Sequence, residues 1–207
     1  MKHQLFLFGA LFFLALPAAR AQQSYSDGYA IGDKATSFSL KDVSGKMVSM
    51  DDYDSAKGYI VIFTCNTCPY SKAYESRISD LHEKYASGGF PVLAVNPNDP
   101  EVSGGDSYEA MKERAAAKGF EFPYLFDPGQ IITKQYGPQR TPHVFLLEKT
   151  SEGNVVRYVG AIDNDTENTN PDKISYVEQA VKAIKSGRQP DPATTKAIGC
   201  GVKWQKS

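Results

Sequence analysis

The stretch Phe63-Thr64-Cys65-Asn66-Thr67-Cys68-Pro69-Tyr70 carries two cysteines separated by two residues. The apolar run Tyr59-Ile60-Val61-Ile62-Phe63 leads into it and has the composition of a buried strand. Residues 71–85 follow it, and their apolar and aromatic side chains recur near one face of a helix. The sequence therefore places both cysteines where a strand ends and a helix begins.

This position predicts reactive thiols. The free N–H groups and partial positive charge of a helix N-terminus stabilise an anion such as a thiolate. We therefore expect the pKa of Cys65 to be low and its nucleophilicity to be raised. The spacing lets both sulfurs lie on the first helical turn, close enough to form a disulfide. We assign Cys65, expected to be the more exposed thiol, as the attacking group and Cys68, one turn into the helix, as the resolving group.

Two other interpretations of the cysteine pair are weaker. A zinc site needs four ligands, and beyond the pair and the N-terminal segment only Cys200, His82 and His143 remain, at no recognisable spacing. A purely structural disulfide is compatible with the spacing, but the strand–helix junction favours redox chemistry. The sequence also has no dinucleotide-binding fingerprint and no phosphate-binding loop, so we expect neither a metal nor a bound cofactor.

The composition indicates one globular domain behind an export signal. The chain has 207 residues, and its 23 basic and 24 acidic residues include no basic cluster that would favour nucleic acid. Lys2 precedes an apolar run over residues 5–16, and Pro17-Ala18-Ala19-Arg20-Ala21 has the pattern of a cleavage site. The run is shorter than the roughly 20 residues that span a membrane. We therefore expect residues 1–21 to be a cleaved signal peptide, and the mature protein to be periplasmic or secreted, with no stable membrane span.

Export decides how the cysteines are interpreted. Disulfides persist outside the cytosol, so a dithiol there needs an electron donor or acceptor in the cell envelope. If Cys65 and Cys68 pair, Cys200 is left over. Its flanking glycines predict a flexible tail, which Trp204 is expected to dock on the body. Cys200 then either relays oxidation or forms a mixed disulfide, or it is an inert tail thiol, and the sequence leaves these alternatives open.

Strand and helix patterns alternate along the chain, which predicts a mixed sheet between helices. We expect the domain to span residues 22–188 and to open with a polar lead-in over 22–31. We expect residues 189–207 to form a C-terminal tail. Gly- and Pro-rich residues 97–106 are predicted to be a loop with a possible role in partner contact. The predicted strands are 38–40 and 47–50 (a hairpin), 59–64, 91–96, 122–126, 144–148 and 155–160; the predicted helices are 69–85, 108–118, 130–136 and 173–185, with a short helical turn at 51–53.

The order of these motifs resembles the thioredoxin-like superfamily: a strand, C-x-x-C-P, a helix, then Thr141-Pro142 before an apolar strand. It is most similar to the peroxiredoxin-related (AhpC/TSA, redoxin) and secreted thiol–disulfide oxidoreductase branches. Gly32–Leu40 followed by Gly45–Met50 resembles the opening hairpin of these proteins, and the match covers about residues 30–186. Gly199–Trp204 resembles a tail of some peroxiredoxin-like proteins with a C-N-x-C-P-Y centre. The resemblance implies a thioredoxin-like α/β fold, a central mixed β-sheet flanked by helices with an N-terminal β-hairpin extension.

The resemblance also implies further site residues. X-Pro bonds are cis in only about 5–6% of cases in folded proteins, but in thioredoxin-like folds the proline at the position of Pro142 is cis and faces the cysteine pair. Thr141 then offers its backbone N–H and C=O to an extended substrate chain by strand addition. Arg140 resembles the arginine that assists peroxide reduction in peroxiredoxins, and it is equally compatible with a plain surface charge.

Two departures from the family patterns matter. Thioredoxin has Trp-Cys-Gly-Pro-Cys at its centre, whereas this chain has Thr64-Cys65-Asn66-Thr67-Cys68, so its redox potential does not follow from the resemblance. Peroxiredoxins carry P-x-x-x-T-x-x-C, but Gly58 and Ile62 stand at the proline and threonine positions here, which weakens a peroxidase reading. Residues 59–63 also lack the buried carboxylate that accepts a proton in thioredoxin. Glu101, in the later loop, is the residue we consider as a substitute proton acceptor.

The leading hypothesis is therefore an exported thiol–disulfide oxidoreductase that exchanges a Cys65–Cys68 dithiol or disulfide with protein thiols and disulfides. One alternative is a thiol peroxidase, in which Cys65 becomes a sulfenic acid and Cys68 condenses with it. The other is a non-catalytic thioredoxin-like binding module with a structural disulfide.

Overall fold

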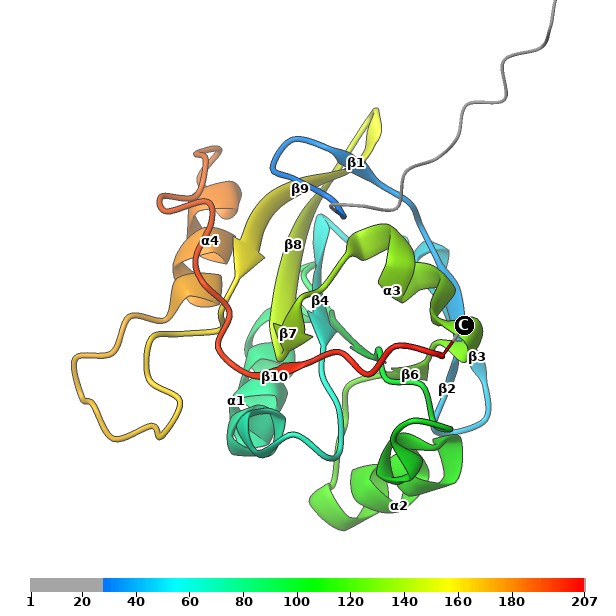
Figure 1. Cartoon of the computed structure of the whole chain (residues 1–207). Coiled ribbons are helices and arrows are strands. Elements are labelled where there is room, and N and C mark those ends of the chain that lie inside the picture. The colour runs from blue at the N-terminus through cyan, green and yellow to red at the C-terminus, as the bar shows by residue number, and fades with distance from the viewer. Residues whose placement is uncertain (1–27, 207) are drawn as a thin grey trace, which may run out of the picture.

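The computed structural model describes residues 28–206. The predicted signal peptide and the first residues of the polar lead-in lie outside them. One eight-stranded sheet forms the centre, with helices on both faces (Figure 1). The helices are α1 (Pro69–Tyr85), α2 (Tyr108–Lys118), α3 (Ile131–Tyr136) and α4 (Tyr176–Lys185), with short 3₁₀ helices η1 (Met50–Asp52), η2 (Gly104–Asp106) and η3 (Pro128–Gln130).

The sheet is mixed, as predicted. Its strands lie in the order β1-β9-β8-β4-β5-β6-β2-β3. The central strands β4, β5 and β6 run parallel to one another, and every other pairing is antiparallel. The strands are β1 (Lys34–Ala35), β2 (Ser39–Asp42), β3 (Met47–Ser49), β4 (Gly58–Phe63), β5 (Val92–Asn96), β6 (Tyr124–Phe126), β8 (His143–Thr150) and β9 (Gly153–Gly160), while β7 (Arg140–Thr141) and β10 (Cys200–Gly201) form a separate pair.

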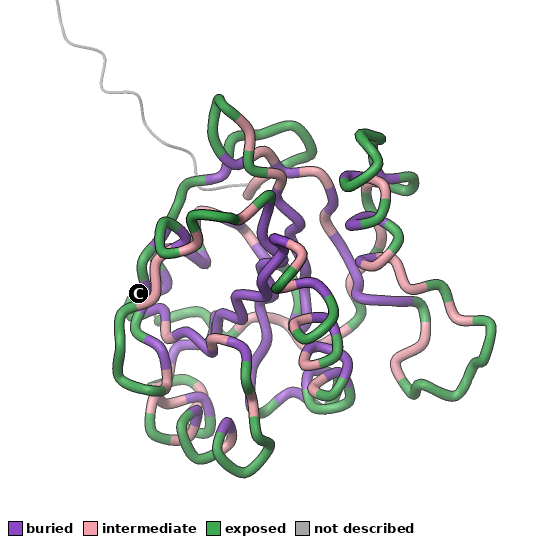
Figure 2. The backbone as a smooth tube through the Cα atoms, turned by 180° about the vertical axis from the view of Figure 1, so that it is seen from behind, coloured by how far each residue is buried: buried purple, intermediate pink, exposed green. Residues whose placement is uncertain are grey.

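Strand β4 organises the core because it is buried on both faces. Side chains alternate across a strand, so Ile60 and Ile62 pack beneath α1, α2 and α4, whereas Val61 and Phe63 pack beneath α3 and the N-terminal segment. Buried residues trace the central strands, and the exposed residues lie on loops and outer helix faces (Figure 2). The two cores hold the end of β4, and therefore the cysteine turn, in a fixed place.

The predicted boundaries of α1 and α2 are confirmed. Helix α2 begins after Ser107, whose hydroxyl oxygen accepts a hydrogen bond from the backbone N–H of Ala110 at 3.3 Å. It ends at Gly119, which adopts the left-handed conformation with φ 64° that glycine tolerates best. Ser107 caps the helix, and the preceding residue, Asp106, makes its contacts elsewhere.

Some elements differ from the prediction. The predicted N-terminal hairpin is present as β2 and β3, and it extends the edge of the main sheet because β2 pairs with β6. Helix α4 begins at Tyr176, three residues later than predicted. The short strands β1, β7 and β10 were not predicted, since two-residue strands carry too few side chains to show an alternating pattern.

A buried ion pair fixes α1 against the loop that follows β9. Arg77 Nη1 lies 2.7 Å from Asp163 Oδ2, and the two side chains are only 8% and 2% exposed. The Tyr74 hydroxyl donates to the other oxygen of Asp163 at 2.8 Å. Arg77 also donates to the backbone carbonyls of Asp165 and Thr166. Removing the guanidinium would leave the Asp163 carboxylate buried without its counter-charge.

We predict that Arg77→Ala lowers the free energy of unfolding by about 3–5 kcal/mol, the usual cost of removing one partner of a buried pair. Urea titration of the reduced protein measures it. The matched control is Lys112→Ala, which breaks an exposed pair with Glu109 and should leave the free energy of unfolding nearly unchanged. Equal effects of the two substitutions would contradict this role of Arg77.

Candidate active site

The cysteine turn lies between β4 and α1, as predicted, and both cysteines precede the first residue of the helix instead of lying on its first turn. Cys68 is the N-cap residue of α1, with extended backbone angles (φ −74°, ψ 125°), and Pro69 is the first helical residue. Cys65 therefore lies in the turn before the helix. Both residues are buried, at 4% and 2% exposure, so exposure to solvent does not distinguish the attacking thiol.

Thr141 lies directly opposite the two sulfurs. The Thr141–Pro142 peptide bond is cis, as the resemblance implied. Cys65 Sγ lies 3.3 Å from the Thr141 hydroxyl oxygen, and the Cys68 thiol donates to the Thr141 carbonyl oxygen at 3.2 Å. The short strand β7 thus brings a backbone edge to within hydrogen-bond distance of the cysteine pair.

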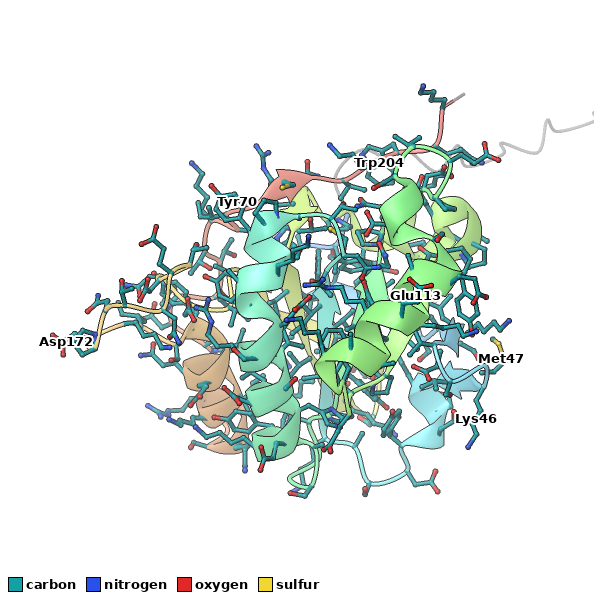
Figure 3. The ribbon with its side chains drawn as sticks, turned by 90° about the horizontal axis from the view of Figure 1, so that it is seen from below. Lys46, Met47, Tyr70, Glu113, Asp172 and Trp204 are labelled. Carbon is teal, nitrogen blue, oxygen red and sulfur yellow. The ribbon has the colours of Figure 1, made fainter. Side chains whose placement is uncertain are left out.

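The C-terminal segment completes this site. Strand β10 pairs antiparallel with β7, with Cys200 opposite Thr141 and Gly201 opposite Arg140. Cys200 lies close enough to Cys68 that its thiol and its backbone N–H both act to lower the pKa of Cys68. In Figure 1 the red C-terminal segment crosses β7, and Figure 3 shows it passing over the N-terminal end of α1, where Tyr70 is labelled. The three cysteines, all free thiols, therefore meet at one place.

The docked segment differs from the flexible tail that the sequence predicted. The backbone of Lys203 accepts from Asp99 N–H and donates to Asn98 Oδ1, both at 2.9 Å, which extends the contact beyond β10. The Trp204 side chain is 42% exposed and stands at the outer edge of the molecule (Figure 3). Hydrogen bonds from the backbone of the segment to Asn98 and Asp99 help to hold it in place.

Hydrogen bonds separate the pKa values of the paired thiols. The pKa of Cys68 is lowered to about 4, chiefly because its sulfur accepts from the Cys65 thiol, with further donors on Cys200 and Ser71 that outweigh burial. The pKa of Cys65 is raised, because its proton is held in that bond, its side chain is buried and the Asp106 carboxylate is near. The donors around Cys68 therefore favour its anion over that of Cys65, the opposite of the order expected from the sequence.

The Asp106 side chain holds the turn between the two cysteines. Its side chain is fully buried, and its carboxylate accepts from the backbone N–H of Asn66 and the hydroxyl of Thr67, both at 2.7 Å. It also accepts from Asn98 Nδ2 at 2.8 Å and from the Ser103 hydroxyl at 2.7 Å. This carboxylate fixes the two residues that separate the sulfurs.

The sequence-derived candidates fall into two groups. Cys65, Cys68, Thr141, Pro142 and Cys200 lie together, whereas Glu101 is exposed on the loop after β5 and has no contact with the pair. The acid that acts on Cys65 is Asp106, not Glu101.

Arg140 is exposed on β7, and its positive charge acts to lower the pKa of Cys200. Gly201 pairs with Arg140 between β10 and β7, so this arginine lies beside the tail.

Asp106 and Asn98 were missed as site residues, although a signal was present. Side chains at the carboxyl ends of neighbouring parallel strands meet at one edge of a sheet. Strand β5 is parallel to β4 and is followed by a polar segment that begins at Asn96 and ends with Asp106. That segment was interpreted as an external loop, yet its polar side chains turn inward to the cysteine turn and the tail.

Residues 28–206 contain no group of three or more His, Cys, Asp or Glu side chains arranged to hold a metal ion. His143 is buried, which lowers its pKa to about 4, and its Nδ1 accepts from the Gln139 backbone N–H. In the same part of the chain, no helix is long and apolar enough to cross a membrane.

Comparison with known proteins identifies the family. Residues 31–165 match the model of the AhpC/TSA family. The chain belongs to this family. The thiol-disulfide oxidoreductase ResA of Bacillus cereus is 25% identical over 165 residues, which cover 77% of this chain and 90% of ResA. A putative peroxiredoxin of Mycobacterium tuberculosis is 25% identical over 134 residues, covering 65% of this chain and 78% of that protein.

Comparison with solved structures also finds a similar fold. The crystal structure of a hypothetical protein from Sinorhizobium meliloti 1021 superposes with a TM-score of 0.79 and 26% identity, over 87% of this chain and 98% of that one. The fold is thioredoxin-like, and the AhpC/TSA relatives are redox proteins, so the general activity of this chain is that of an oxidoreductase.

We predict that the thiolate absorbance of the reduced protein titrates with a midpoint near pH 4, because the donors around Cys68 favour its anion. The thiolate then persists at neutral pH and is lost only as the pH falls through this value. Cys200→Ala removes one donor and should move the midpoint upward, and Cys68→Ser should abolish the transition. A wild-type midpoint at the ordinary thiol value of about 8.5 would contradict the assignment.

We predict that Asp106→Asn destabilises the reduced protein by about 2–3 kcal/mol, since hydrogen bonds to a charged group contribute about 1.5–3 kcal/mol. It should also lower the pKa of Cys65, because the negative charge that raises it is removed. Urea titration and the pH dependence of alkylation at Cys65 measure the two effects. Glu101→Gln is the control on the same loop, and an equal change in both variants would refute the role of Asp106.

Proposed function

We propose that this protein is an exported thiol–disulfide oxidoreductase that cycles Cys65 and Cys68 between a dithiol and a disulfide. The proposed substrates are protein thiols and disulfides, presented as extended segments. The N-terminal pattern of residues 1–21 supports export, to the periplasm or outside the cell, where an electron donor or acceptor in the envelope would reset the pair.

One observation carries the proposal: both sulfurs touch Thr141, whose backbone already pairs with an added strand. A substrate segment that pairs with β7 in the same way presents its cysteine to Cys68. A pure scaffold for a structural disulfide has no need of a low-pKa thiolate beside such an edge. The family relationship to ResA is consistent with this chemistry.

The thiolate on Cys68 and its contact with the added strand favour it as the attacking sulfur. Cys68 then attacks the substrate disulfide and forms a mixed disulfide, and one substrate sulfur leaves as a thiolate. Cys65 attacks Cys68 Sγ, which releases the second substrate thiol and leaves the Cys65–Cys68 disulfide. The roles expected from the sequence are thereby exchanged. The direction depends on the potential of the pair, and related centres span roughly −270 to −120 mV.

A second candidate is thiol peroxidase activity. The pattern of peroxiredoxins places a threonine hydroxyl near the peroxide, and this chain has Ile62 at that position. The Thr141 hydroxyl, 3.3 Å from Cys65 Sγ, offers a substitute. The relationship to a putative peroxiredoxin also favours this candidate.

We predict reversible exchange between the Cys65–Cys68 pair and glutathione, measured by tagging free thiols and weighing the intact protein across a range of redox buffers. In a Cys200→Ala background, Cys65→Ser should trap glutathione on Cys68, whereas Cys68→Ser should trap at least tenfold less on Cys65. The opposite trapping pattern would restore Cys65 as the attacking thiol. If no reversible exchange appears in any buffer, the disulfide is structural, and the hypothesis of a non-catalytic binding module is favoured.

The same proteins separate the two activities. An oxidoreductase should exchange disulfides rapidly and consume hydrogen peroxide no faster than the variant without Cys65 and Cys68. Peroxide consumption that depends on Cys65, together with a trapped sulfenic acid at this residue, would favour the peroxidase instead.

A further inference from the structure

The C-terminal segment occupies the edge that a substrate would use. Strand β10 adds to β7 with Cys200 opposite Thr141, the residue that contacts both Cys65 and Cys68. The Cys200 thiol and N–H both reach the Cys68 sulfur. The chain therefore presents one of its own cysteines to the pair in the geometry of an added strand.

A close backbone approach makes this fit specific. A Cβ atom on Gly199 would lie 2.0 Å from the Thr141 carbonyl oxygen and 3.3 Å from Pro142 N, both backbone atoms that have no freedom to move aside. Only glycine allows the segment to lie this near the cis peptide. Gly201, on the other side of Cys200, has open space at the same position. The two glycines that flank Cys200 thus differ in what they contact.

Buried side chains hold the segment beyond β10. Gln130 is 1% exposed and donates from Nε2 to the Lys203 carbonyl oxygen at 2.9 Å, while its Oε1 accepts from the Gln205 N–H at 2.8 Å. Asn98, which is 4% exposed, accepts from the Lys203 N–H and donates to Asp106. The anchors of the tail are therefore built into the same network that supports the cysteine turn.

The charges around Cys200 suit a thiol that reacts with the oxidised pair. Its pKa is raised to about 11 by burial and by the hydrogen bond and negative charge of Cys68, whereas Lys203 and Arg140 act to lower it. Once Cys68 is in a disulfide, its charge is gone, and the two cations remain. Cys200 is thus deprotonated more easily when its partner is oxidised than when it is reduced.

We infer that Cys200 is a third redox thiol of this site, on a tail that acts as an internal substrate and exchanges disulfides with Cys68. The inference rests on the proposed redox function of the Cys65–Cys68 pair. The Cys200 thiolate attacks Cys68 Sγ, the Cys68–Cys200 bond forms as the Cys65–Cys68 bond breaks, and Cys65 leaves as a thiolate that takes up the proton Cys200 lost. One disulfide is present before and after, so the step needs no external oxidant or reductant.

This step has a consequence for external substrates. A protein segment that adds to β7 must displace β10, because the two compete for the same edge. The tail therefore lowers the rate at which strand-like substrates reach Cys68, and it holds the oxidised pair as Cys68–Cys200 until a substrate or donor replaces it.

The test uses the full chain with Cys65→Ser, treated with oxidised glutathione and mapped by mass spectrometry. Glutathione takes the two electrons and two protons, and we expect an intramolecular Cys68–Cys200 disulfide in the monomer. Adding Gly199→Ala should reduce its yield at least tenfold, because the alanine cannot lie against Thr141, while adding Gly201→Ala should leave the yield unchanged. No Cys68–Cys200 disulfide, or equal yields in the two glycine variants, would overturn the inference.

Trp204 provides a second readout that does not depend on activity. It is the single tryptophan of the chain, so its fluorescence anisotropy reports the mobility of the tail. Gly199→Ala in the otherwise wild-type protein should lower this anisotropy and accelerate reaction with a disulfide-containing peptide at least tenfold, and Gly201→Ala should do neither. A lower anisotropy with an unchanged reaction rate would show that the docked tail does not block substrates and would overturn that part of the inference.

Failure of this inference is separable from failure of the proposed function. If wild-type Cys65–Cys68 exchanges with glutathione but Cys65→Ser forms no Cys68–Cys200 bond, only the third thiol is refuted. If the wild-type pair itself shows no exchange, the proposed function falls as well.

Discussion

The backbone of Thr141 is the constraint on which the site depends. Its carbonyl oxygen meets the Cys68 thiol, its hydroxyl meets Cys65, and its strand edge pairs with Cys200. Two segments that are far apart in the sequence, the cysteine turn and the C-terminal tail, thus meet at this one residue. The two hydrophobic cores on either side of β4 make this convergence possible, because they fix the end of that strand against the end of its antiparallel neighbour β8.

Electrostatics then separate the two cysteines. The N-terminus of α1 and its donors favour the anion of Cys68, while burial and the Asp106 carboxylate disfavour that of Cys65. Asp106 belongs to a polar cluster that connects the turn to the tail through Asn98. A change in the tail therefore affects the sulfurs directly, through Cys200, and indirectly, through the hydrogen bonds of Asn98 and Asp106.

The sequence predicted the helices and strands that have long apolar patterns. The boundaries of α1 and α2, the central strands and the mixed sheet follow from apolar periodicity and caps, and the cis Thr141–Pro142 bond was expected from the family resemblance. It did not predict the role of Asp106 or the docking of Cys200. These depend on contacts between residues 40 to 105 positions apart, and two-residue strands such as β7 and β10 carry no periodic signal.

Hydrogen–deuterium exchange over residues 198–205 tests the central claim, that the Thr141 edge binds an extended chain, most directly. The account predicts slow exchange of the Lys203 and Gln205 amides in the free protein, because both donate to buried side chains. It predicts that exchange accelerates when a peptide containing a disulfide is added and takes the edge. Two results would contradict this claim. One is that these amides exchange as fast as those of an unstructured chain in the free protein, and the other is that the peptide leaves their exchange rate unchanged.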